Sequence, residues 1–183
     1  MKGLRGARER GRLASMRPLP VLKADCSACA ALCCMALAFD AGPDFGHDKP
    51  ALHPCRHLAG NACTIHARLA EAGYGGCARF DCLGAGQRLM AEVFPGADWR
   101  ADPALRAPLA EGLAALRAIH GALELLVAAR DLPLGGALAD EHAALMALFH
   151  PPAPWTGEAL RRFDLPGAKA RLRRFLQALR PLV

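Results

Sequence analysis

The sequence is poor in aromatic residues, with seven Phe, two Trp and one Tyr in 183 residues. Its formal net charge of +6 comes from basic residues that gather near the two ends of the chain. No basic stretch is interleaved with aromatic residues, which is the pattern that single-stranded nucleic-acid binding would need. The composition therefore argues against nucleic-acid binding and favours solvated basic helix faces.

Long apolar runs and a secretory leader are also missing. We find no apolar run approaching the roughly 18 residues that span a bilayer, and the Arg-rich start has no small-residue cleavage site. We therefore expect no membrane span and a cytoplasmic location, where thiols are normally held reduced. Met16 is a plausible second start, so we assign no function to the residues before it.

Familiar catalytic motifs are absent as well. The sequence has no Walker loop, no nucleophile elbow and no internal repeat of about 20 to 50 residues. The GAGQ stretch at 84–87 is predicted to be a turn. Several aspartates lie near cysteines, but we predict turn and cap roles for Asp25, Asp40, Asp44, Asp48 and Asp81. We predict no catalytic residue and expect a non-catalytic protein in preference to an enzyme.

The sequence does contain a sharp division of residue types. All eight cysteines lie between Cys26 and Cys82, among turn-forming stretches rich in Gly and Pro. This division predicts a flexible basic arm at 1–20, a cysteine-cluster metal-binding module at 21–98 and a helical bundle segment at 99–183. Ala and Leu dominate and β-branched residues are scarce, which favours helix. We expect a mainly α fold in which a cysteine-rich module of short helices and loops packs on an antiparallel helical bundle.

Helical periodicity begins after the last cysteine. Leucines recur at spacings of three and four over 105–127, which predicts one apolar face on a long helix. Asp102 and Pro103 supply an N-cap and a first-turn residue, and Pro108 either kinks this helix or marks its start. Further helices are predicted at 137–149 and 166–179, the latter with arginines on its wet face.

The cysteines are spaced in a way that suggests metal coordination. They are Cys26, Cys29, Cys33, Cys34, Cys55, Cys63, Cys77 and Cys82. Two cysteines separated by two residues, as at the start of this set, can reach one metal from a tight turn. The adjacent pair points in directions about 100 degrees apart if helical, so its members more naturally serve two sites, or one of them packs. Eight thiolates suffice for two four-ligand sites or for one cluster with spare cysteines.

Alternatives to metal binding remain open for this set. Some of the thiols could form disulfides, act as a redox pair at Cys26 and Cys29, or be buried as small apolar side chains. Cys34 is the weakest ligand candidate because Met35 and Leu37 continue an apolar face that it could share. A cytoplasmic location lowers the case for disulfides, and no βαβ context supports a thioredoxin-like pair.

The histidines differ in their promise as ligands. His66 lies near Cys63 within the cluster, and the family resemblance described below makes it the best candidate. We list it with the eight cysteines as a metal ligand. Replacement ligands could come from His47, His53 and His57. In the helical half we predict surface or capping roles for His120, His142 and His150.

Four motifs carry a resemblance to the CxxCxxCC family of zinc- or iron-chelating cysteine-cluster proteins. They read CSACAALCC, CRHL, CTIH and CARFDC, and they cover roughly Cys26 to Cys82. The first departs from the family by one extra residue before Cys33. The run GCARFDCLGAGQ followed by DWR also resembles the N-terminal region of actinobacterial pentapeptide-repeat proteins, although the repeats themselves are absent here.

The resemblance implies a bound zinc, iron or iron–sulfur cluster and little about process. At the Cys-x-Ile-(Tyr/His) motif the family accepts tyrosine in the position of His66, so this residue need not bind metal. A related cysteine motif occurs in flagellin lysine methylases, which look like iron–sulfur enzymes. We expect a metal-stabilised binding or scaffold module with an unknown protein partner, the alternative being an iron–sulfur redox or methyl-transfer component.

Overall fold

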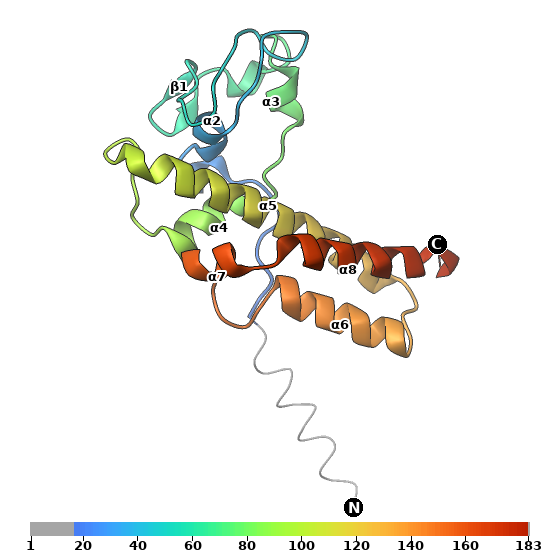
Figure 1. The fold of residues 1–183 in the computed structure, drawn as a ribbon. Coiled ribbons are helices and arrows are strands. Elements are labelled where there is room, and N and C mark those ends of the chain that lie inside the picture. Colours follow the sequence, from blue (N-terminus) through green and yellow to red (C-terminus); the bar gives the residue numbers. More distant parts are fainter. Residues whose placement is uncertain (1–16, 183) are drawn as a thin grey trace, which may run out of the picture.

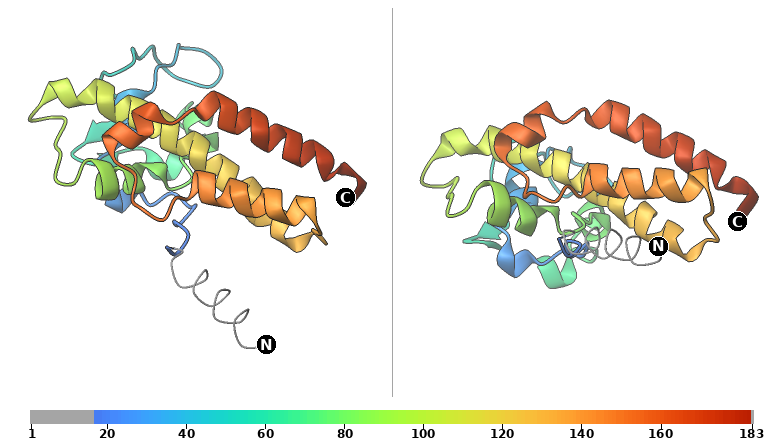
Figure 2. Two further views of the ribbon diagram at one scale, coloured as in Figure 1. Left: turned by 60° about the horizontal axis from the view of Figure 1, so that its bottom comes forward. Right: turned by 90° about the horizontal axis from the view of Figure 1, so that it is seen from below.

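The computed structural model describes residues 17–182, and its framework is helical (Figure 1). The longest helix, α5 (Arg106–Ala128), packs against α6 (Ala137–Phe149) and α8 (Leu165–Ala178). Helix α6 runs antiparallel to α5 and α8, as Figures 1 and 2 both show. The predictions of a mainly α fold and of an antiparallel bundle are confirmed.

The long helix begins where its capping residues predict. The Asp102 carboxylate accepts the Ala104 N–H at 3.0 Å, and Pro103 opens the short 3₁₀ turn η4 (Pro103–Leu105) that leads into α5. Pro108 lies in the first turn of α5, where a backbone N–H would have no helical partner, so it belongs to the start of the helix. Helix α8 is capped in the same way by Asp164, which accepts the Gly167 N–H at 3.0 Å.

The hydrophobic core follows the predicted apolar faces. Helix α5 stands at its centre because it buries residues along its whole length, and the predicted stripe of α8 is buried at Ala168, Leu172 and Phe175. The hydrophobic side chains of α5 below 4% exposure are Leu109, Leu113, Leu116, Ile119, Leu123 and Leu126. The spacing of three and four therefore marks the buried face as expected.

Short helical elements near the bundle were not predicted. Helix α4 (Ala85–Arg88) continues into a π-helical turn, η3 (Leu89–Val93), and α7 (Gly157–Arg162) precedes α8. The prediction that 84–87 is a turn is wrong beyond Gly84, since α4 begins at Ala85. Gly84 itself has φ +76°, and a Cβ there would lie 2.1 Å from the carbonyl oxygen of Val21.

Two of the three bundle histidines are buried, so a surface position is wrong for both, although His150 does stand at the C-cap of α6. His120 is fully buried and His150 is 4% exposed. Their rings are enclosed because each has a partner from a distant segment: His120 meets Arg88 and Leu83, and His150 meets the Arg17 carbonyl oxygen at 3.0 Å. His142 matches the capping prediction, because its Nε2 lies 2.8 Å from the carbonyl oxygen of Leu126 in the last turn of α5.

A small polar network joins the start of the described chain to the bundle. The Glu92 carboxylate pairs with Arg17 at 2.5 Å and with Arg88 at 3.2 Å, and it accepts the Trp155 N–H at 3.1 Å. Most of the predicted basic arm, residues 1–16, lies outside the described residues. Arg17 is held by the pair with Glu92.

The central helix is apolar enough to resemble a membrane span. An 18-residue window within Pro103–Asp131 has a mean hydropathy of 1.5, and half of it is buried inside the protein. We expected no apolar run of about this length, so the sequence analysis underestimated the hydropathy of this helix. Its packing is that of a bundle's central helix, which touches α2, α4, α6, α7 and α8.

The cysteine-rich part sits on one side of α5 (Figure 1, top). Its short elements are η1 (Cys26–Ala28), α2 (Leu32–Ala36), the hairpin strands β1 (Leu58–Ala59) and β2 (Ala62–Cys63), η2 (His66–Arg68) and α3 (Gly75–Arg79). Helix α2 attaches this part to the bundle because Leu32, Met35 and Ala36 belong to the same core as α5. The remaining elements are the terminal turns η5 (Ala129–Asp131) and η6 (Arg180–Leu182).

Candidate metal centre

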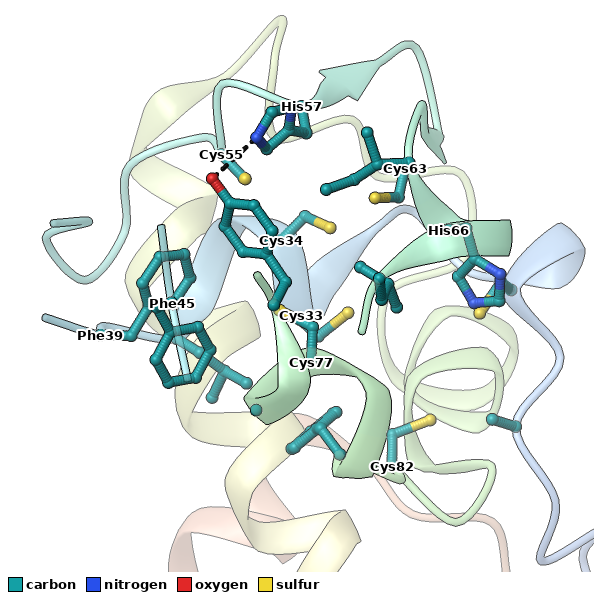
Figure 3. A pocket seen from close by; sticks show the side chains of 18 of the residues that line it. Cys33, Cys34, Phe39, Phe45, Cys55, His57, Cys63, His66, Cys77 and Cys82 are labelled. Atoms are coloured by element: carbon teal, nitrogen blue, oxygen red, sulfur yellow. Dashed lines mark hydrogen bonds between the residues drawn. The ribbon is translucent and has the colours of Figure 1, made fainter. Parts of the chain in front are cut away.

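Seven of the eight cysteines line one cavity of about 180 Å³. Figure 3 shows Cys34, Cys55 and Cys63 at one end with His57, Cys82 at the other end, and Cys33 and Cys77 between them. The seven come from six separate pieces of chain: Cys26 in η1, Cys33 and Cys34 in α2, Cys55, Cys63 in β2, Cys77 in α3, and Cys82. Side chains from distant segments thus face a common space.

The eighth cysteine, Cys29, does not line this cavity. The Asp25 carboxylate caps η1 by accepting the Ser27 N–H at 3.0 Å, and the Cys29 N–H bonds the Cys26 carbonyl oxygen at 3.4 Å. This tight turn aims the Cys29 sulfur at α4. A Cβ on Gly86 would lie only 2.7 Å from that sulfur, so the absence of a side chain at Gly86 makes room for it.

Backbone hydrogen bonds bring Cys34, Cys55 and Cys63 together. The Cys55 N–H donates to the Cys34 carbonyl oxygen at 3.0 Å, which docks the segment before β1 on α2. The Leu58 N–H then bonds the Cys55 carbonyl oxygen at 3.0 Å, and Leu58 pairs with Cys63 across the hairpin. The two-residue strands therefore place Cys63 close to the turn that carries Cys55.

Helix α3 presents Cys77 through a close contact of a glycine with a phenylalanine. A Cβ on Gly76 would lie 2.1 Å from the Phe45 ring, so only glycine lets α3 approach it so closely. The Phe45 ring stacks on Phe39 with centroids 4.3 Å apart. The Gly76 N–H also donates to the Asp44 carbonyl oxygen at 3.2 Å. These contacts form the apolar wall of the cavity beside Cys77.

The single tyrosine, which the sequence analysis did not single out, anchors a polar cluster at the cavity. The Tyr74 hydroxyl is 2.9 Å from His47 Nδ1 and 2.8 Å from His57 Nε2, and Arg56 donates to it at 3.1 Å. Tyr74 is only 4% exposed. Because a hydroxyl has one proton to donate, at most one of the two imidazoles accepts it and the other donates its own N–H. The cluster ties α3 to the segment that carries Cys55.

A buried lysine was also missed. Lys49 is 3% exposed, and its ammonium group donates to the carbonyl oxygens of Met35 at 3.1 Å, Pro50 at 3.3 Å and Leu37. Within residues 17–182 no carboxylate forms an ion pair with it. Burial lowers the pKa of Lys49, whereas negative charge on neighbouring thiols, Cys55 first, raises it. The neighbouring groups that would favour its charge by ionising are therefore thiols.

The thiols influence one another strongly. A hydrogen bond between the side chains of Cys33 and Cys34 lowers the pKa of Cys33 to about 7 and raises that of Cys34. Burial raises the pKa of Cys29 to about 11, although N–H groups of Leu32 and Ala31 oppose the shift by hydrogen bonding. Burial and neighbouring thiolates together raise the pKa of Cys26 and Cys77. Without a cation among them, these thiols resist ionising together.

The structure places the predicted ligands as follows. All eight cysteines are free thiols. His66 is exposed and lines the cavity, as does His57, whereas His47 and His53 do not. Within the described part of the chain, no three His, Cys, Asp or Glu side chains are arranged to hold a metal ion as they stand. The donors face one space without forming a finished coordination shell.

Three of the five aspartates near the cysteines have the predicted turn or cap roles. Asp25 caps η1, Asp48 accepts the Ala41 N–H at 2.6 Å, and Asp81 accepts the Leu83 N–H at 2.7 Å. Asp44 pairs with Arg79 at 2.6 Å in an exposed position. Their oxygens are therefore engaged in turns and surface contacts.

Comparison with known proteins gives one informative match. A stretch of 83 residues, 45% of the chain, is 45% identical to a protein of Bacillus subtilis strain 168 described as the uncharacterized protein YybG. The stretch covers 30% of that protein, so the chain corresponds to less than a third of the relative's length. No protein-family model matches the chain, and no solved structure matches it. The resemblance to the CxxCxxCC family therefore rests on its four motifs.

Proposed function

We propose that residues 21–98 are a thiolate metal-binding module that uses zinc or iron to hold its loops for an unknown protein partner. The observation that supports this proposal most is that seven cysteines from six pieces of chain line one cavity. Ionised thiols that share one space repel one another unless a soft cation compensates their charge. The hydrogen-bonded pair of Cys33 and Cys34 and the buried ammonium of Lys49 point to negative charge in this space.

The donor set fits a thiophilic metal. The cysteines and His66 offer the sulfur and imidazole ligands that zinc, cuprous copper and iron–sulfur clusters prefer, and the nearby carboxylates are engaged elsewhere. A metal bound there would link loops with few apolar contacts of their own. Structural zinc contributes about 10–16 kcal/mol of binding free energy in small peptides, which is ample to order these loops.

Elemental analysis of anaerobically purified full-length protein tests the proposal. We expect zinc or iron in whole-number ratio to the chain, and we expect Cys55→Ser to lower that ratio. The matched control is Ser27→Ala, which removes a hydroxyl within η1 and no thiol. Protein that contains no metal and binds none when zinc or iron is supplied anaerobically would disprove the proposal.

A second candidate function is an iron–sulfur redox or methyl-transfer component. It is favoured by the apolar walls of the cavity, where Phe39, Phe45 and Phe80 lie beside the thiols and could contact an organic substrate. Visible charge-transfer absorption together with iron and inorganic sulfide would support this function. A colourless protein that carries only zinc would exclude it and leave the binding-module proposal standing.

A further inference from the structure

Resting on that proposed function, we infer that the eight cysteines form two adjoining four-thiolate metal sites rather than one. The first, the α4-side site, consists of Cys26, Cys29, Cys33 and Cys82. The second, the hairpin-side site, consists of Cys34, Cys55, Cys63 and Cys77. Both have the donor set of a tetrahedral zinc or an iron centre.

The α4-side site is assembled around the start of α4. The Gln87 amide brackets the segment before η1, because its oxygen accepts the Asp25 N–H at 2.8 Å and its nitrogen donates to the Lys23 carbonyl oxygen at 3.0 Å. The Cys29 sulfur lies against Gly86 in the same helix. The Ala85 N–H bonds the Cys82 carbonyl oxygen at 2.9 Å. Contacts with α4 therefore fix the positions of the turn that holds Cys26 and Cys29 and of Cys82.

The hairpin-side site is assembled around the other face of the cavity. The backbone bond from Cys55 to Cys34 and the pairing of Leu58 with Cys63 join three of its thiols. The Tyr74 hydroxyl, three residues before Cys77, holds α3 against His57, two residues after Cys55. Figure 3 shows Cys34, Cys55 and Cys63 together and Cys82 at the opposite end.

Cys33 marks the place where the two sites adjoin. Its side chain forms a hydrogen bond with that of Cys34, and Figure 3 shows it with Cys77 between the two ends of the cavity.

Lys49 makes the two sites chemically different. Its ammonium is buried beside α2, where it donates a 3.1 Å hydrogen bond to the carbonyl oxygen of Met35, the residue that follows Cys34 of the hairpin-side site. A four-thiolate zinc centre carries a net charge of −2, which a buried ammonium offsets in part. The hairpin-side site therefore has a built-in countercharge.

Zinc titration of the full-length apoprotein under anaerobic conditions tests the division. We expect two zinc ions per chain and protection of all eight thiols from an alkylating reagent. Cys82→Ser should leave one ion and an intact hairpin-side site, and Cys63→Ser should leave one ion and an intact α4-side site. The double variant should retain neither. Helical circular dichroism serves as the folding check, because the bundle core lies outside both sites.

A single zinc ion per chain, or loss of both ions from either single variant, would overturn the two-site inference while leaving metal binding in place. Absence of any bound metal would instead overturn the proposed function itself. Lys49→Gln supplies a second measurement: it should weaken zinc binding about tenfold or more in the Cys82→Ser protein and leave the Cys63→Ser protein unchanged. Arg79→Gln, which removes an exposed cation near Cys77, is the matched control and should affect neither. Equal weakening of both proteins by Lys49→Gln would contradict the assignment.

Discussion

The indole Nε1 of Trp99 donates a 2.8 Å hydrogen bond to the carbonyl oxygen of Ala30. Trp99 is 1% exposed and precedes the long central helix, whereas Ala30 directly follows Cys29. Arg100 covers the indole, with its guanidinium 4.0 Å from the ring centroid. This bond therefore joins the start of the helical half to the first cysteine knuckle, 69 residues earlier in the chain.

Trp99→Phe should destabilise the protein by about 1–3 kcal/mol, because it keeps most of the ring and leaves the buried Ala30 carbonyl without its donor. Urea unfolding followed by circular dichroism measures the change. The matched control is Trp155→Phe. Trp155 is also buried, but its Nε1 has no hydrogen-bond partner within the described residues, so this substitution should cost clearly less. Equal losses from the two variants would argue against the role of the Trp99 bond.

Gly86→Ala should destabilise the protein by about 1–3 kcal/mol even though alanine is the better helix former. The new Cβ would lie 2.7 Å from the Cys29 sulfur, which must then move. The control is Gly121→Ala in α5, where the nearest atom would be at 3.7 Å, and this change should stabilise. A double-mutant cycle with Cys29→Ala locates the clash. If the cost of Gly86→Ala persists when the sulfur is gone, the contact is not its cause.

Glu92→Gln should destabilise the protein by about 2 kcal/mol. This carboxylate is 16% exposed and holds both Arg17 and the nearly buried Arg88, so its loss leaves two cations without their partner. Glu158→Gln is the matched control, because the pair of Glu158 with Arg162 is largely exposed and should contribute little. Thermal unfolding of both variants at low and high salt makes the comparison. A Glu92→Gln protein as stable as the wild type would show that the network is not needed.

His120 should make the protein lose stability in mild acid. Burial lowers the pKa of His120 to about 4, with the Arg88 charge acting in the same direction, while the bond to Leu83 opposes it. The Arg88 guanidinium donates to Nε2 at 3.1 Å, so Nδ1 carries the proton and donates to the Leu83 carbonyl oxygen at 2.5 Å. Below about pH 6.5 the histidine of the unfolded chain binds a proton, whereas the folded ring stays neutral until about pH 4. The free energy of unfolding therefore decreases as the pH falls from about 6.5 to about 4.

At pH 5 this difference amounts to about 2 kcal/mol relative to pH 7.5. The free energy of unfolding of His120→Gln should therefore fall less between these two pH values than that of the wild type. His142→Gln is the control: it replaces an α6 ring that meets the Leu126 carbonyl oxygen of α5, and it should retain the wild-type loss of stability. If His120→Gln and the wild type lose the same free energy of unfolding between pH 7.5 and pH 5, another group causes the pH dependence.

The bundle could be predicted because its signals are local. Leucine spacing marks the buried face of α5, and the predicted bounds of α6 agree with the structure because Gly136 and His150 flank a continuous helical pattern. Helix α4 and α7 escaped prediction because helices of four to six residues owe their stability to tertiary contacts, which no local pattern records.

The site could be predicted in composition but not in arrangement. Motif spacing indicated that cysteines from separate segments belong together, and seven of them line one cavity. The different direction of Cys29 depends on Gly86, 57 positions later in the chain, so spacing within the first motif does not reveal it. Lys49 and Tyr74 escaped notice because their burial depends on partners that only the folded chain brings near. Metal binding itself stays a prediction.

Removal of metal should loosen only the outer part of the cysteine region, residues 38–80. Helix α2 has two faces: Cys33 and Cys34 face the cavity, whereas Leu32 and Met35 are fully buried in the core shared with α5. Residues 38–80 have few core contacts and lie on the side away from α6 and α8 (Figure 1). We therefore expect chelation to disorder this segment and to leave α2 and α4 packed on α5.

Hydrogen exchange with and without a thiol-safe chelator measures this difference. Amides of β1, β2 and α3 should exchange much faster after chelation, while those of α5, α6 and α8 keep their protection. Re-addition of zinc or iron should restore the slow exchange and so separates metal loss from irreversible damage. Uniform acceleration across the bundle would mean that the metal supports the whole fold. Unchanged exchange in 38–80, despite proven metal loss, would mean that the loops are ordered by their own packing around Tyr74 and Phe45.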